Sequence, residues 1–73
     1  MLERIVQLVK DIVGNDEIDI SLNSSLKEDI GMNSYERVQL TGLLEDEFGV
    51  SISSRQMRQF NKIQDIVDYL QSC

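Results

Sequence analysis

Residues 28–49 read EDIGMNSYERVQLTGLLEDEFG, a short turn that runs into an amphipathic segment. Asn33 stands before this segment and Glu36 follows three residues later, which is the spacing of a helix-starting capping box. Gly49 ends the pattern, because glycine readily adopts the left-handed conformation found after helices. The segment therefore predicts a helix that opens at Asn33, with an apolar stripe of Val38, Leu40, Leu43, Leu44 and Phe48.

Helical patterns also flank this stretch on both sides. Before it, apolar residues recur at helical spacing up to Gly14 and Asn15, which stop the first helix: Leu2, Ile5, Val6, Val9, Ile12 and Val13. After it, Ser53 caps a short element in which Met57 and Phe60 face inward. Asn61 and Gln64 then repeat the capping pattern before a last helix built on Ile63, Ile66, Val67 and Leu70.

Residues 15–32 have a different character. Ile18, Ile20 and Leu22 alternate with polar residues, which is the period of a strand, but the sequence offers no good partner strand. We predict a long loop that holds alternate apolar side chains against the core, and loops of this length are often functional. The expected fold is all-α: one domain over residues 1–73, a small bundle of three main helices and one short helix.

Composition excludes several functions. Thirteen acidic and seven basic residues give a net charge of −6, which disfavours nucleic acid and favours a partner with a basic surface. Histidine is absent, which removes imidazole acid–base chemistry and histidine-based zinc sites. The single cysteine, Cys73, and the lack of a signal peptide or membrane span predict a cytoplasmic protein. We expect a monomer.

No metal site is expected. Glu45, Asp46 and Glu47 are consecutive, so on a helix their side chains diverge by about 100° each and cannot share one ion. Asn15, Glu17 and Asp19 resemble the start of a calcium loop, but Ile20 occupies the position of its required glycine. Both groups are interpreted as solvated surface.

Ser34 is the main candidate for a functional residue. It occupies the first position of the predicted helix, where free backbone N–H groups and the helix dipole favour an attached phosphate. Serine at a helix start is also a common capping residue, so this position alone leaves both interpretations open.

The segments 28–35, 38–40, 44–52 and 66–70, in this order and spacing, strongly resemble the acyl carrier protein family. The resemblance implies that Ser34 carries a 4′-phosphopantetheine arm, which a phosphopantetheinyl transferase attaches from coenzyme A. It also implies that the chain is a carrier and not an enzyme. The carrier would hold an acyl group as a thioester in fatty-acid, polyketide or related biosynthesis, and would present it to enzymes with basic docking surfaces. Its partner-docking residues would be Asn33, Tyr35, Glu36, Val38, Glu45, Asp46 and Glu47.

The resemblance also implies an acyl pocket, lined by Leu40, Leu44, Ile52, Met57, Phe60 and Tyr69. Members of the family commonly have a smaller side chain at the position of Met57 and an aliphatic one at the position of Phe60, so we expect short or polar cargo. Gly42 would add space if it faced inward. Asn33 and Tyr35 replace the usual Asp and Leu, and basic residues occupy a normally acidic region, namely Arg55, Arg58 and Lys62.

Two alternatives stay open. Within the carrier class, the cargo could be an aminoacyl or peptidyl group. In a different class, the chain would be a helical protein-interaction module without a prosthetic group, in which Ser34 only caps a helix. These alternatives differ in whether the chain gains mass when it meets coenzyme A and a broad-specificity transferase.

Overall fold

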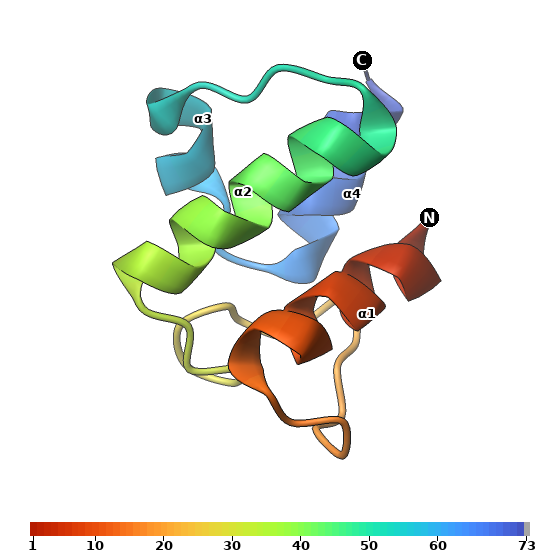
Figure 1. The fold of residues 1–73 in the computed structure, drawn as a ribbon, viewed down its shortest axis with the longest axis vertical. Coiled ribbons are helices and arrows are strands. Elements are labelled where there is room, and N and C mark those ends of the chain that lie inside the picture. The colour runs from red at the N-terminus through yellow and green to blue at the C-terminus, as the bar shows by residue number, and fades with distance from the viewer. Residues whose placement is uncertain (73) are drawn as a thin grey trace.

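The computed structural model describes residues 1–72 and contains four helices joined by loops (Figure 1). The helices are α1 (Leu2–Val13), α2 (Ser34–Phe48), α3 (Ser54–Gln59) and α4 (Ile63–Gln71). In this described part of the chain, extended pairing is limited to an isolated bridge between Ser25 and Lys62. The predicted all-α, four-helix architecture is confirmed. Cys73 lies outside the described residues.

Two glycines end helices where the sequence predicted. Gly14 follows α1 with φ 71°, and Gly49 follows α2 with φ 65°, both in the left-handed region. Each glycine N–H donates back to a carbonyl of the last turn, that of Lys10 or Glu45, at 2.9 Å. The left-handed residue thus satisfies a helix-end carbonyl and turns the chain away from the axis.

The start of α4 differs from the prediction. The N-cap residue is Lys62, and Asp65 supplies the side-chain cap: its Oδ2 accepts from the backbone N–H of Asn61 at 2.9 Å and of Lys62 at 3.0 Å. Gln64 instead donates from its side chain to Asp68. The predicted Asn61 and Gln64 cap was wrong because Asp65, at the third helical position, reaches back to the N-cap N–H.

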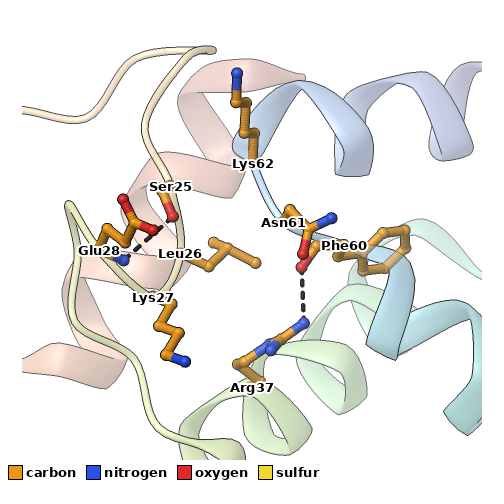
Figure 2. A pocket seen from close by; sticks show the side chains of 8 residues that line it. All are labelled: Ser25, Leu26, Lys27, Glu28, Arg37, Phe60, Asn61 and Lys62. Carbon is orange, nitrogen blue, oxygen red and sulfur yellow. Dashed lines mark hydrogen bonds between the residues drawn. The ribbon is translucent and has the colours of Figure 1, made fainter.

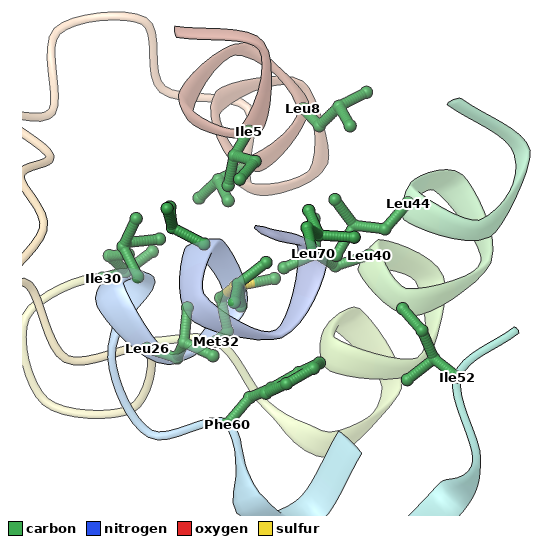
Figure 3. Packing of buried hydrophobic residues seen from close by; sticks show 14 residues of the cluster. Ile5, Leu8, Leu26, Ile30, Met32, Leu40, Leu44, Ile52, Phe60 and Leu70 are labelled. Carbon is green, nitrogen blue, oxygen red and sulfur yellow. The ribbon is translucent and has the colours of Figure 1, made fainter. Parts of the chain in front are cut away.

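The core is shared by three helices and the long loop. Figure 3 shows Ile5 of α1, Leu40 and Leu44 of α2, and Leu70 of α4 meeting around one interior. No residue of α3 is fully buried, so this short helix covers the edge of the bundle. The full set of buried apolar residues is Ile5, Leu8, Val9, Leu26, Ile30, Met32, Leu40, Leu44, Ile52, Phe60, Ile63, Ile66, Val67 and Leu70.

The loop between α1 and α2 is an ordered wall of the bundle, as predicted. It buries Leu26, Ile30 and Met32, and the alternating residues Ile18, Ile20 and Leu22 pack against the core in part-buried positions. Backbone bonds fasten it to the start of α4: Leu26 N donates to Asn61 O, and Gln64 N donates to Leu22 O, both at 2.9 Å. These bonds therefore fix the position of the loop, and with it the direction in which the chain enters α2.

The apolar stripe predicted for α2 needs correction. Leu40 and Leu44 are buried, but Val38 is 56% exposed and Leu43 is 39% exposed. Val38 and Gly42 each precede a buried leucine by two residues, about 200° around the helix, and so lie on its outer side. Gly42 accordingly opens no space in the core: a Cβ added there would meet nothing within 4 Å.

Candidate functional site

The start of α2 is held by a complete capping box around Ser34. Glu36 N donates to Asn33 Oδ1 at 2.8 Å, and Asn33 N donates to Glu36 Oε1 at 3.1 Å. Ser34, the first helical residue, takes no part in these bonds. The predicted capping box is therefore confirmed, and the helix start does not depend on the serine hydroxyl.

The Ser34 side chain is exposed, and its hydroxyl is not engaged by other residues of the described chain. In residues 1–72 its hydroxyl makes no hydrogen bond, and the backbone N–H groups of Ser34 and Tyr35 have no acceptor. Unpaired N–H groups at a helix N-terminus, together with the helix dipole, favour an anion. A phosphate joined to Ser34 Oγ would meet these donors in open solvent, so the site fits a phosphate-linked arm.

The turn before Ser34 fixes where the hydroxyl lies. Gly31 has φ 80°, a conformation that side-chain-bearing residues rarely adopt. Met32 follows it, is 3% exposed, and donates its N–H to Leu26 O at 2.8 Å. The buried methionine ties the turn to the core, while Ser34, two residues later, remains on the surface.

Ser34 is not activated as a nucleophile. An activated serine needs a general base within hydrogen-bond reach, and the Ser34 hydroxyl contacts none in the described residues. The chain also contains no histidine.

The predicted docking residues divide into free and engaged groups. Tyr35 and Val38 are 71% and 56% exposed on α2 and provide an apolar patch beside Ser34. Of the acidic run, Glu45 Oε2 accepts from Ile52 N at 2.8 Å, and Glu47 pairs with Arg4 at 2.9 Å. Asp46 is exposed and makes no such bond in residues 1–72. Asp46 thus retains its full capacity for an external partner.

The Arg4–Glu47 pair joins α1 to the end of α2. The hydrogen bond that Arg4 donates to the Glu47 carboxylate, and after it the negative charge of that carboxylate, raises the pKa of Arg4. Both side chains are solvent-exposed, so the pair contributes little to stability. The larger effect of the pair is electrostatic: the positive charge of Arg4 partly neutralises the negative charge that Glu47 would present to a partner.

Four of the six predicted acyl-pocket residues border small pockets: Ile52 and Met57 border one of about 260 Å³ between α2 and α3, and Phe60 and Tyr69 border one of about 300 Å³ between α3 and α4. Leu40, Leu44, Ile52 and Phe60 are buried, while Met57 and Tyr69 are half-buried. The Phe60 and Tyr69 rings meet edge to face, with centroids 5.6 Å apart, and Tyr69 Oη donates to Ser51 O at 2.8 Å. These contacts place two aromatic side chains between the end of α3 and α4.

Arg37 is a feature that the sequence analysis missed. It is the basic residue of an otherwise acidic α2, and its side chain is half-buried. One guanidinium nitrogen donates to Phe60 O at 2.7 Å (Figure 2). The same nitrogen donates to Met57 O at 3.1 Å, and the two bonds tie α2 to the end of α3. An isolated basic residue within an acidic helix was the available signal.

Comparison with known proteins agrees with this geometry. The family described as "Phosphopantetheine attachment site" matches residues 3–70, and the chain belongs to this family of phosphopantetheine-binding carrier proteins. Its structure is similar to that of a protein described as a "putative acyl carrier protein" from Mycobacterium tuberculosis. The two share 30% sequence identity with a TM-score of 0.90, over 97% of this chain and 95% of the other.

Membership defines the class of function. The chain is a carrier protein with a covalently attached 4′-phosphopantetheine group, and it carries acyl groups rather than catalysing a reaction. Its family implies interaction with a phosphopantetheinyl transferase and with acyl-handling enzymes. Within residues 1–72, none of the helices combines the length and the apolar character needed to cross a membrane.

Proposed function

We propose that Ser34 is the residue to which the arm is attached. The observation that carries this proposal is the free, exposed Ser34 hydroxyl at the start of α2, flanked by Asn33 and Glu36, which do the capping. The two unpaired N–H groups of Ser34 and Tyr35 would stabilise the phosphate once it is attached.

The attachment step requires only a hydroxyl from this chain. Ser34 Oγ forms the new bond to the phosphorus that bears the pantetheine. The pyrophosphate bond of coenzyme A breaks, and the nucleotide half leaves with the other phosphate. The serine proton passes to a base of the transferase, because residues 1–72 place none beside Ser34.

We further propose that the cargo is short or polar. The Phe60–Tyr69 ring contact and the Arg37 bonds to the Met57 and Phe60 carbonyls hold α2, α3 and α4 together around the predicted acyl region, and the pocket between α2 and α3 has a volume of only about 260 Å³. Insertion of further methylenes into a packed core costs about 1–3 kcal/mol, and the Phe60 ring has little freedom to adapt. Such cargo suits specialised acyl or polyketide biosynthesis better than synthesis of long fatty acids.

The partner surface proposed for the transferase and the loading enzymes lies on the outer side of α2. Tyr35 and Val38 supply apolar area next to Ser34, and Asp46 supplies unpaired negative charge. Glu36, Glu45 and Glu47 can each accept a further bond, since a carboxylate has about four lone-pair sites. A basic partner surface with an apolar centre would match this pattern.

Intact-mass analysis tests the proposed function. Any arm already present on the purified chain is first removed with a phosphodiesterase-type hydrolase. The chain is then incubated with coenzyme A and a broad-specificity transferase, and its intact mass is measured before and after this incubation. One phosphopantetheinyl unit should be added, and fragmentation should place it on Ser34. A chain that gains no mass would instead behave as an interaction module without a prosthetic group.

A further inference from the structure

A pocket lies between the long loop, α2 and the α3–α4 junction, and its volume is about 300 Å³. That volume is at the small end of the range for ligand sites, so a small group fits better than a chain. Its walls are held in place: Leu26 N donates to Asn61 O at 2.9 Å, and Ile63 N donates to Ser24 O at 3.2 Å. The pocket therefore exists before any ligand arrives.

The pocket is basic in an acidic protein. Lys27, Arg37 and Lys62 line it, three of the seven basic residues in a chain of net charge −6 (Figure 2). Neither lysine forms an ion pair within residues 1–72. Glu28 is the acidic residue of the lining, and Figure 2 shows its carboxylate on the Ser25 side, away from Arg37.

Arg37 has neutral partners only. Its guanidinium bonds to the Phe60 and Met57 carbonyls, and its buried Nε has no hydrogen-bond partner in the described chain. A half-buried cation without a counter-ion is unfavourable, and a carboxylate beside the guanidinium would supply the missing negative charge. The pocket thus has the chemistry of an anion site with one cation already positioned.

The pocket lies close to Ser34. Arg37 follows Ser34 by three residues on α2, a spacing that places two side chains about 5–6 Å apart at Cβ. A flexible arm on Ser34 could fold back over this one helical turn. We propose that the pocket binds the terminal carboxylate of a short dicarboxylic acyl group carried on the arm. This proposal rests on Ser34 as the attachment residue.

The phosphate of the arm is a second anion near the pocket. It would be fixed to Ser34 Oγ, where the N–H groups of Ser34 and Tyr35 point, whereas the guanidinium of Arg37 is directed toward the α3–α4 junction. The cargo end of the arm is mobile and can reach that junction. The carboxylate of the cargo is therefore the better match, and the experiment below separates the two anions.

The test compares the arm alone with two acyl groups of equal carbon number. The chain is loaded from coenzyme A, butyryl-coenzyme A or succinyl-coenzyme A, and loading is confirmed by intact mass. At low salt, the succinyl form should melt about 4 °C above the butyryl form. Amide NMR signals of Leu26, Lys27, Asn61 and Lys62 should shift on succinyl loading and stay in place on butyryl loading.

Matched variants locate the effect. Lys27→Gln combined with Lys62→Gln changes two exposed side chains and should remove most of the difference between the two acyl forms. Arg55→Gln, on exposed α3 outside the pocket lining, should preserve it. Equal melting of both acyl forms, or a difference that survives the double variant, would overturn the proposal. The same shifts in the form with the arm alone would assign the pocket to the phosphate.

A second measurement does not depend on the arm. Free succinate is titrated into the unmodified chain at constant ionic strength and followed by the same amide signals. Saturable shifts confined to the pocket support the proposal, and their absence contradicts it. Failure of loading, by contrast, would count against Ser34 as the attachment residue, so the two failures are distinguishable.

Discussion

Asn33 and Glu36 cap α2 reciprocally, each accepting on its side chain the backbone N–H of the other, at 2.8 Å and 3.1 Å. Ser34 lies between them in sequence, and its hydroxyl makes no hydrogen bond in residues 1–72. The two requirements at this helix start, a stable cap and a free hydroxyl, are thus met by different residues.

This division of roles predicts different costs for two neighbouring substitutions. Asn33→Ala should lower the free energy of unfolding by about 1 kcal/mol, because one helix-start N–H loses its acceptor. Ser34→Ala should change it by less than about 0.5 kcal/mol, since an exposed, unbonded hydroxyl is removed. Urea denaturation followed by circular dichroism measures both. Equal losses would show that Ser34 shares in the cap.

Gly42 and Gly49 provide a second matched pair. Gly42→Ala should stabilise the protein by roughly 1 kcal/mol, because Gly42 is exposed within α2 and a Cβ there meets nothing within 4 Å. Gly49→Ala should destabilise it by about 1–2 kcal/mol, because its φ of 65° is strained for alanine. Thermal melts of the two variants should move in opposite directions. If Gly42→Ala destabilised the protein instead, the assignment of Gly42 to the outer side of α2 would be wrong.

The helix ends were predictable because their causes are local. Gly14, Asn33, Gly49 and Ser53 act through bonds to residues within one turn, and sequence spacing alone reveals such bonds. The start of α4 was mistaken because Asn61 and Asp65 both offer suitable side chains. Which of these two side chains caps the helix depends on how the preceding loop orients the backbone. The spacing of residues in the sequence carries no information about that orientation.

The role of Arg37 depends on long-range contacts. Its partners, Met57 and Phe60, are 20 and 23 residues away, and nothing in the helical period distinguishes an anchored arginine from a solvated one. Val38 is the opposite case. It fits the broad apolar stripe predicted for α2, but the side of the helix that faces the core is that of Leu40 and Leu44, and Val38 is exposed. The candidate site residue could be predicted, whereas the basic pocket beside it required the tertiary structure.

Docking to a basic transferase should depend on salt. Charges on the outer side of α2 accelerate encounter, and ionic strength screens that attraction, so kcat/KM for modification should fall as salt rises. Asp46→Asn should slow modification more than Asp16→Asn, a control in the distant loop, because Asp46 is unpaired within residues 1–72 and lies on α2. Rates that are independent of salt would contradict an electrostatic docking surface.

Cargo length should have little effect on stability. Each CH₂ buried in the core would add about 0.8 kcal/mol, so a carrier with an open pocket gains melting temperature as the chain lengthens. Here Phe60 and Tyr69 meet edge to face, and the pocket between α2 and α3 has a volume of only about 260 Å³. We expect melting temperatures of butyryl, octanoyl and dodecanoyl forms to agree closely. A steady rise with chain length would show that the core admits the chain.

The most direct test of the central claim compares two serines in the same helical position. Ser34 and Ser54 are the first residues of α2 and α3, and both are exposed. Each is replaced by alanine, and intact mass is measured after incubation with coenzyme A and a broad-specificity transferase. We expect one phosphopantetheinyl unit on Ser54→Ala and none on Ser34→Ala. A Ser34→Ala protein that still gains the unit would contradict this expectation.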